Sequence, residues 1–165
     1  MNKLFRLILV VALLALGVWL WTVLCPGPER IIRKRLAQVA RAASFGPNEG
    51  TLSRLANVAQ LAGYFSADIE VKIEALGRGQ HTFSGRDEIT QAALAARSAA
   101  GALNVEFLDV GMTMAPDRQS AVADLTAKAA VPGQKDFEVQ EMNFALKKID
   151  GEWLITRAET VKTLR

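Results

Sequence analysis

Three hydrophobic patterns follow one another along the chain. An unbroken apolar run occupies Leu7–Cys25, segments in which apolar residues recur at helical spacing follow it, and segments that alternate apolar and polar residues fill most of the second half. Helical spacing is typical of helices that bury one face, whereas strict alternation is typical of half-buried strands. The sequence therefore predicts an apolar anchor, then helices, and then mainly a sheet.

The apolar run predicts a transmembrane helix. Leu7–Cys25 contains no charged residue, and about 20 apolar residues are needed to cross the hydrocarbon core of a bilayer. Trp19 and Trp21 lie near its end, where indole rings favour the membrane interface. Because Pro26-Gly27-Pro28 then breaks the helix, we divide the chain into a membrane anchor with its break, residues 1–28, and one folded domain, residues 29–165.

A cleaved signal peptide is the alternative interpretation of the same run. The apolar stretch is long for a signal peptide and no A-x-A-like cleavage site follows it, so an uncleaved single-pass anchor is favoured. The short basic N-terminus resembles a bacterial export signal, which favours a domain outside the cytoplasmic membrane. The richer basic flank after the run favours the cytoplasmic side instead. Between these two signals, we predict the outer side.

Basic residues flank the run on both sides. They are Lys3 and Arg6 before it, and Arg30, Arg33, Lys34 and Arg35 after it. Nucleic-acid binders more often carry a basic stripe with interleaved aromatic residues on a folded face, so a membrane, and no nucleic acid, is the expected partner of this flank. The flank then either contacts anionic lipid headgroups or is simply a solvated helix face beside the anchor.

The sequence of the first part of the domain predicts three helices and a strand. The helices are expected over Glu29–Ser44, over Thr51–Phe65, and from a capping-box pattern at Ser84–Asp87 to Ala100. Asp68–Leu76 alternates as a half-buried strand. A turn at Gly77–Gln80 then leads into His81.

The second part predicts four long, bent strands. They are expected over Asn104–Ala115, Ser120–Val131 and Asp136–Ile149, and around Trp153 and Ile155 after the hairpin turn Asp150-Gly151. The apolar phase changes inside the first of these strands, which predicts a β-bulge near Phe107 and Leu108. A second change is predicted inside the third strand, from Phe137 and Val139 to Met142, Phe144 and Leu146.

The order helix, helix, strand, helix and four bent strands resembles the nuclear transport factor 2-like superfamily, which includes SnoaL-like polyketide cyclases. The resemblance extends from Glu29 to the C-terminus, and it is also carried by Phe83–Ile89 at the third helix and by the closing hairpin Lys148–Ile155. It implies an α+β, cystatin-like fold, in which a curved antiparallel sheet forms a cone around three N-terminal helices and a pocket. It implies no single activity, because the superfamily hosts isomerases, dehydratases, cyclases, hydrolases and binding modules.

Enzymes of this superfamily often carry Asp, His or Tyr inside the cone, and the resemblance makes Tyr64, His81 and Asp109 the candidates for catalysis. A packing tyrosine, an exposed loop histidine and an ordinary strand aspartate are the stronger interpretations of these residues. Asp68 is better explained as a turn residue. The pocket would be lined by Tyr64, Met112, Met114, Met142, Phe144, Trp153 and Arg157. Methionines in such positions are more often core residues. Arg157 would either hold an anion or extend along the surface.

Other chemistries lack the residues they need. The chain has a single histidine and a single cysteine, so neither a metal site nor a Ser-His-Asp triad is expected, and no cofactor motif is present. The polar positions of two strands are expected to face outward: Asp124, Lys128, Glu141, Asn143 and Lys147, with Thr126 and Lys128 opposite Glu141 and Asn143. This outer face is either ordinary solvated surface or a homodimer surface.

The leading hypothesis is a membrane-tethered, non-catalytic binding or envelope-assembly domain, because single-anchor envelope assembly factors resemble this architecture. The alternatives are a small-molecule enzyme of isomerase, dehydratase or cyclase type and a lipid binder, both of which would use the cone pocket. A polar pair inside the cone would favour the enzyme, and an open apolar cavity would favour the lipid binder. A filled cone would favour the binding domain.

Overall fold

The computed structural model describes residues 13–14, 16, 27–75, 79–134 and 137–161. Among these residues, no helix has both the length and the apolarity that a membrane crossing requires. The predicted anchor Leu7–Cys25 lies outside the described residues except for Leu13, Leu14 and Leu16. The described domain begins at Gly27 and extends to Val161.

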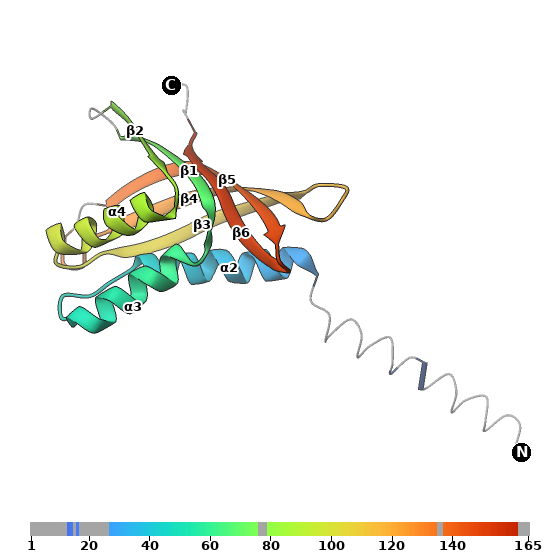
Figure 1. Cartoon of the computed structure of the whole chain (residues 1–165), viewed down its shortest axis with the longest axis horizontal. Coiled ribbons are helices and arrows are strands. Elements are labelled where there is room, and N and C mark those ends of the chain that lie inside the picture. The colour runs from blue at the N-terminus through green and yellow to red at the C-terminus, as the bar shows by residue number, and fades with distance from the viewer. Residues whose placement is uncertain (1–12, 15, 17–26, 76–78, 135–136, 162–165) are drawn as a thin grey trace, which may run out of the picture.

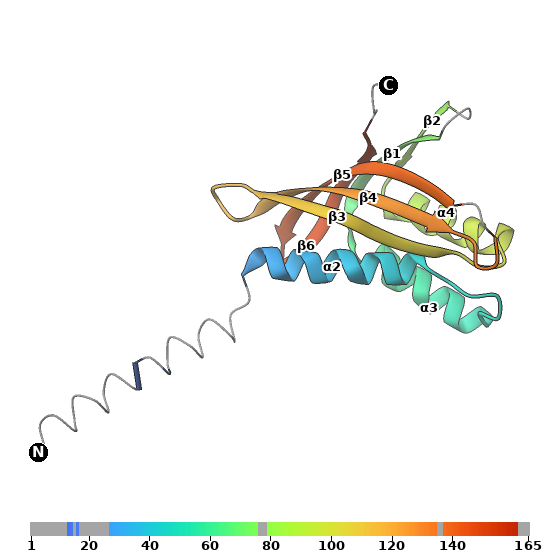
Figure 2. The same cartoon turned by 180° about the vertical axis from the view of Figure 1, so that it is seen from behind.

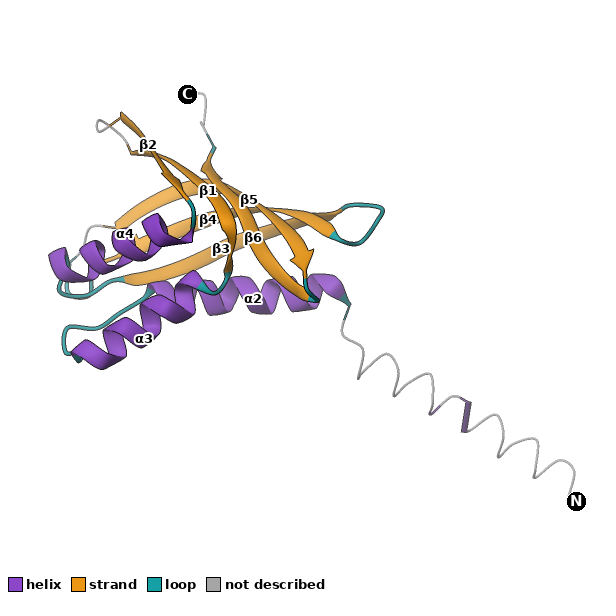
Figure 3. Cartoon of the chain, in the orientation of Figure 1, coloured by secondary structure: helices purple, strands orange, loops and turns teal. Residues whose placement is uncertain are grey.

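Three helices of the described domain cover one face of a curved, six-stranded sheet (Figure 1). The elements are α2 (Pro28–Ala43), α3 (Thr51–Ala62), β1 (Phe65–Ala75), β2 (Gly79–Ser84), α4 (Arg86–Ala99), β3 (Asn104–Met114), β4 (Ser120–Ala130), β5 (Phe137–Ile149) and β6 (Glu152–Thr160). The strand order is β2-β1-β6-β5-β4-β3. Views from both sides place α2 along the same face of the sheet (Figures 2 and 3). The predicted α+β fold with three helices and a curved sheet is confirmed.

The sheet is mixed, which corrects the expectation of an antiparallel one. β1 pairs with β6 in parallel, with Glu70 beside Arg157 and Val71 beside Ala158, while the other four pairs are antiparallel. Short turns join consecutive strands into antiparallel hairpins, whereas β1 and β6 are connected through the rest of the domain and can run in one direction. Alternation in the sequence determines which face of a strand is buried, but not which partner the strand takes.

The second helix is shorter than predicted, and the first strand begins earlier. α3 ends at Ala62, and β1 already starts at Phe65, which pairs with Ile155 of β6. The Tyr64 N–H still donates to the Leu61 carbonyl over 3.1 Å, which closes the end of the helix. Pairing with a strand from the other end of the chain therefore determines the conformation of Phe65.

The predicted bulge in β3 is confirmed. The pairing of β3 with β4 shifts between Leu108 and Gly111, and Asp109 has a left-handed φ of +50°. The bulge lies slightly after the predicted position. It allows Phe107 and Met112, which have opposite phases in the sequence, to pack against the same core.

The phase change predicted within β5 is wrong. β4 pairs with β5 without a register shift. Phe137 and Val139 therefore lie on the face opposite to Phe144, and they are 58% and 51% exposed. The irregularity lies instead in the pairing of β5 with β6, between Ala145 and Leu146.

The core lies between the sheet and the helices. Ile32 and Leu36 of α2 are 0% and 1% exposed, and they belong to the same cluster as Ile69, Leu146 and Ile155 of the sheet. Burying a large aliphatic side chain contributes about 1.5–3 kcal/mol to stability. The apolar face that was predicted from the spacing of residues in the first helix is therefore what holds α2 on the sheet.

α4 begins with a variant of the capping box, in which the acidic side chain accepts the N–H of the residue before the N-cap. Its N-cap is Gly85, with a φ of +82° and no side chain to bond the helix. Glu88, not the predicted Asp87, accepts a hydrogen bond from the backbone N–H of Ser84 over 2.7 Å. The predicted pattern was therefore placed one residue too early, because the helix starts after Gly85 rather than after Ser84.

Candidate functional site

The interior of the cone is filled by apolar side chains. Of the predicted pocket lining, Tyr64, Phe144 and Trp153 are buried, and Met112, Met114 and Met142 are half-buried against the same core. The ring of Phe107 meets that of Phe144 edge to face, with centroids 5.5 Å apart. The apolar members of the predicted lining therefore pack against one another as core residues.

Tyr64 connects three elements. Its hydroxyl accepts a hydrogen bond from the Gln60 side-chain amide over 3.1 Å, and the Arg35 guanidinium lies over its ring at 5.2 Å from the centroid. Its backbone carbonyl accepts the N–H of Ile155 over 3.0 Å. Tyr64 is 6% exposed and joins α2 and α3 to β6, which agrees with the packing interpretation.

The other catalytic candidates lie on opposite edges of the sheet. His81 is exposed on β2, and Asp109 is exposed in the bulge of β3; β2 and β3 are the first and last strands of the sheet order. Asp68 is also exposed, and the nearby Ser66 hydroxyl is the main cause that lowers its pKa. An acid and a base that act on one substrate must reach the same few ångströms. His81 and Asp109 therefore lie on different edge strands, and Tyr64 lies between α3 and β1.

Arg157 lies on the outer face, which corrects its predicted place in the pocket. Its guanidinium is 3.2 Å from the Glu70 carboxylate, which also binds Lys72 over 3.1 Å. The Lys72 and Arg157 cations lower the pKa of Glu70. The irregularity in the pairing of β5 with β6 reverses the phase of β6 after Ile155, so the alternation that began at Trp153 does not continue to Arg157.

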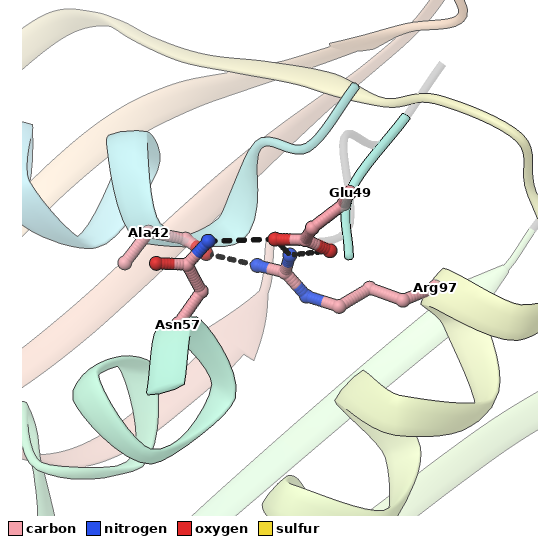
Figure 4. Close-up of polar contacts among 4 residues, drawn as sticks. All are labelled: Ala42, Glu49, Asn57 and Arg97. Atoms are coloured by element: carbon pink, nitrogen blue, oxygen red, sulfur yellow. Dashed lines mark hydrogen bonds and ion pairs between the residues drawn. The ribbon is translucent and has the colours of Figure 1, made fainter. Parts of the chain in front are cut away.

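A buried polar cluster, which the sequence did not predict, joins the three helices (Figure 4). Arg97 of α4 has a side chain that is 2% exposed, and its Nη1 atom donates to both carboxylate oxygens of Glu49, over 2.6 and 2.7 Å. Its other terminal nitrogen donates to the backbone carbonyl of Ala42 at the end of α2. Asn57 of α3 donates to the same carboxylate over 2.6 Å. The Arg97 guanidinium also lies 4.9 Å from the ring centroid of Phe45.

The electrostatics of this cluster favour an ionised Glu49. Burial raises the pKa of Glu49, but the hydrogen bonds from Arg97 and Asn57 and the charge of Arg97 outweigh it, so the pKa lies below its ordinary value. Each partner is occupied by the others, and the cluster holds the loop between α2 and α3 in place. A sequence signal existed, because Arg97 follows Ile89 and Ala93 at steps of four on the buried stripe of α4.

No protein-family model matches this chain, and no curated protein matches it. Solved structures do match. A domain of unknown function with a cystatin-like fold from Nostoc punctiforme has a TM-score of 0.63 and 18% identity, covering 86% of this chain and 80% of its own. A nuclear transport factor 2-like protein from Novosphingobium aromaticivorans has a TM-score of 0.61 and 17% identity, covering 89% and 86%. The described domain has the cystatin-like fold.

Proteins of different kinds share this cystatin-like fold. The yeast UBP3-associated protein BRE5 matches with a TM-score of 0.61 and 12% identity, over 82% of this chain and 97% of its own. A proposed scytalone dehydratase from Novosphingobium aromaticivorans matches with a TM-score of 0.58 and 15% identity, over 82% and 84%. At such identities the likeness shows the fold and no activity.

The outer face of the cystatin-like sheet carries apolar side chains. We call Leu108, Phe137 and Val139 the outer apolar patch; they are 42%, 58% and 51% exposed. Lys128 lies among them, with its Nζ atom 5.1 Å from the ring centroid of Phe137. Clustered apolar residues on a polar-rimmed surface are typical of interaction sites.

The polar residues of this outer face surround the patch. Asp124, Glu141 and Lys147 are exposed, as predicted, and Thr126 lies opposite Glu141. The second predicted pair is wrong, because Asn143 lies opposite Asp124 and donates to its carboxylate over 2.7 Å. Lys128 lies opposite Val139. The register therefore places the cation beside the patch.

The basic flank is partly used by the domain itself. Arg35 forms an ion pair with Glu152 over 3.1 Å, and Arg33 donates to the Val110 carbonyl of the bulge over 2.8 Å. Arg30 and Lys34 are exposed on α2. Lys3 and Arg6 lie outside the described residues. In the part of the chain that the structure describes, no group of three or more His, Cys, Asp or Glu side chains could hold a metal ion.

Proposed function

We propose that this chain is a membrane-tethered, non-catalytic binding domain that assembles through the outer face of its sheet. The observation that carries the proposal is the filled cone: Trp153, Phe144 and Tyr64 are 3%, 4% and 6% exposed where a ligand pocket was predicted. The catalytic candidates His81 and Asp109 lie on opposite edges of the sheet. Because the interior is filled, we propose that recognition takes place on the surface of the domain.

The outer apolar patch is the recognition surface in this proposal. Phe137 and Val139 are more than half exposed, next to one another on the same face of β5. Lys128 and Glu141 provide charges of both signs around the patch. A surface with an apolar centre and mixed charges at its rim can be self-complementary across a two-fold axis, so a second copy of the chain is the proposed partner.

The tether in this proposal is Leu7–Cys25, which is long and apolar enough in sequence to cross a bilayer. We place it in a bacterial cytoplasmic membrane, with the domain on the outer side. A tethered domain diffuses in two dimensions close to the membrane. This raises its effective concentration for its partner, so that a modest patch is sufficient for assembly.

Native mass spectrometry of the full chain released from detergent micelles tests the proposal. We expect a dimer without added small-molecule mass, and we expect Val139→Lys to convert it into a monomer because a lysine ammonium would be desolvated at the interface centre. Leu52→Lys is the matched control, since Leu52 is 84% exposed on α3, away from the patch. A wild-type monomer, or equal dissociation by both substitutions, would contradict assembly through this face.

The alternative is a ligand-binding cone, either an enzyme or a lipid binder. Its support is the likeness to a proposed scytalone dehydratase and the half-buried methionines Met112, Met114 and Met142, which are adaptable side chains packed against the core of the cone. In the same measurement, a co-purified small molecule that leaves on unfolding would favour this alternative over the non-catalytic domain. Loss of that molecule in Met142→Trp would place it in the cone.

A further inference from the structure

A basic hollow lies where α2 begins. It has a volume of about 620 Å³ and lies between the first turns of α2 and the turn that joins β3 to β4, with Arg30, Arg33, Met114 and Arg118 in its wall. Figure 1 shows the start of α2 at the same end of the sheet as this turn. Residues that are about 85 positions apart in the sequence thus contribute to one concave surface.

The charges in the hollow are mainly positive. Three arginines line it, and Glu29 is the one acidic residue among its described lining residues. Arg30 and Arg33 are three positions apart on one helix, so both side chains lie on the same side of α2. Arg33 is anchored by its bond to the Val110 carbonyl, over 2.8 Å. Arginine guanidinium groups bind phosphate oxygens through two parallel hydrogen bonds.

The third arginine is positioned by its turn. Arg118 has a left-handed φ of +55°, and its N–H donates to the Ala115 carbonyl over 3.0 Å. The next N–H, that of Gln119, donates to the Asp117 carboxylate over 2.9 Å. Within the described part of the chain, neither Arg118 nor Arg30 has a side-chain hydrogen bond or ion pair with another residue. Both guanidinium groups therefore keep their donors for a ligand.

The position of the hollow relates it to the membrane. Gly27 and Pro28 belong to its wall, and Gly27 follows Cys25, the last residue of the apolar run, by two positions. We infer that the hollow binds the phosphate of an anionic phospholipid headgroup, with Met114 against the apolar part of the headgroup region. This inference rests on the proposed membrane tether, because the tether is what would bring the hollow to the headgroups.

Titration of the detergent-solubilised full chain with phosphatidylglycerol, followed by native mass spectrometry, tests the inference. We expect Arg118→Gln and Arg30→Gln each to weaken lipid binding about fivefold, the effect of one arginine near an anionic membrane surface. Arg41→Gln is the matched control, because Arg41 is an exposed arginine in the last turn of the same helix and its loss changes the net charge equally. Equal weakening by Arg41→Gln would overturn the inference in favour of diffuse charge attraction.

Two further arms identify the source of the phosphate. The headgroup of phosphatidylcholine contains a phosphate but has no net charge. We expect phosphatidylcholine to bind the wild type weakly, and Arg118→Gln to leave this weak binding unchanged. Inorganic phosphate at millimolar concentration is expected to leave bound phosphatidylglycerol in place. Equal binding of phosphatidylcholine, or displacement of the lipid by inorganic phosphate, would overturn a lipid headgroup site; the second outcome would indicate a site for free phosphate.

Alkaline carbonate extraction of membranes separates this inference from the proposed function. If the full chain is released into the soluble fraction, the proposed tether fails and the inference loses its basis. If the chain remains in the membrane while Arg118→Gln and the wild type bind phosphatidylglycerol equally, the headgroup site alone is wrong. Retention in the membrane together with fivefold weakening supports both.

Discussion

At the scale of single residues, Arg97 and Glu49 form the most buried charge pair of the described domain, with side chains 2% and 10% exposed. Such a pair contributes little net stability compared with apolar residues, but the loss of one partner leaves the other charge buried and unpaired. We expect Arg97→Ala to lower the free energy of unfolding by about 2–4 kcal/mol. Thermal denaturation of the full chain in detergent, followed by circular dichroism, measures this loss.

The control for this prediction is Arg41→Ala, which removes an exposed arginine from α2. It is expected to change the free energy of unfolding by less than about 0.5 kcal/mol. A second comparison is Arg97→Leu. If that variant is as stable as the wild type, the cluster does not hold the helices together.

The pH dependence of stability follows from the lowered pKa of Glu49. A carboxyl group whose pKa is depressed in the folded state binds protons more readily when the chain is unfolded, so its contribution is complete above the ordinary value of about 4.5 and disappears as the pH falls through the folded pKa. We expect Glu49→Gln to reduce the fall in stability between pH 5 and pH 3. Urea denaturation at a series of pH values measures this, with the exposed Glu138→Gln as control. Parallel curves for wild type and Glu49→Gln would contradict it.

At the scale of elements, the start of α4 depends on one side chain. Glu88 accepts the Ser84 N–H over 2.7 Å, and Asp87 carries the same charge in the same turn but does not accept that N–H. We expect Glu88→Ala to cost about 1 kcal/mol, as the loss of a capping contact does, and Asp87→Ala to cost about 0.5 kcal/mol, the effect of the helix dipole alone. Chemical denaturation of the two variants compares them. Equal losses would mean that charge, not the hydrogen bond, matters.

Periodicity predicted the elements well where one face is buried throughout. The stripe of Ile32 and Leu36 and the alternation from Ala121 to Leu125 both face the core, as expected. Phe65 was assigned to a helix because its apolar character fits either structure, and its pairing with Ile155 involves residues 90 positions apart. Local pattern contains no information about such a partner.

Changes of phase within strands were predicted correctly in one strand and wrongly in two. In β3, apolar residues on both sides of the bulge are buried, so the change of phase was visible in the sequence. In β6 the change of phase follows Ile155 and turns Arg157 outward. The sequence does not distinguish an arginine that faces a pocket from one that faces solvent. In β5, Phe137 and Val139 suggested burial only because an exposed apolar pair was not expected.

At the scale of the whole molecule, two surfaces with different chemistry face different directions. The helix layer, which Figure 3 shows on one face of the sheet, carries the basic hollow at the start of α2. The outer apolar patch belongs to the other face, because its exposed residues on β5 have the phase opposite to that of the buried Phe144. Lipid binding at the first surface would therefore leave the second free. Under the two proposals made above, the domain would contact the membrane and a second copy at the same time.

The side of the membrane on which the domain lies is the last prediction. Five basic residues follow the apolar run, the four of the flank and Arg41, and two precede it, which by itself favours a cytoplasmic domain. Two of the five, Arg33 and Arg35, bind Val110 and Glu152 of the folded domain, so their presence has a structural reason that is independent of orientation. We therefore retain the export-like N-terminus as the stronger signal and predict that the domain lies outside.

Cysteine labelling in intact bacteria decides the orientation. In a Cys25→Ala background, the exposed Gln91 of α4 is changed to cysteine and treated with a membrane-impermeant maleimide. If the domain lies outside, the cysteine is labelled before lysis and lysis does not increase the labelling. If the domain is cytoplasmic, the cysteine is labelled only after lysis. Ala123→Cys serves as control, because that position is 0% exposed and should react in neither case unless the domain unfolds. Labelling of Gln91→Cys only after lysis would reverse the predicted orientation and place the basic hollow at the inner leaflet, where anionic lipids also lie.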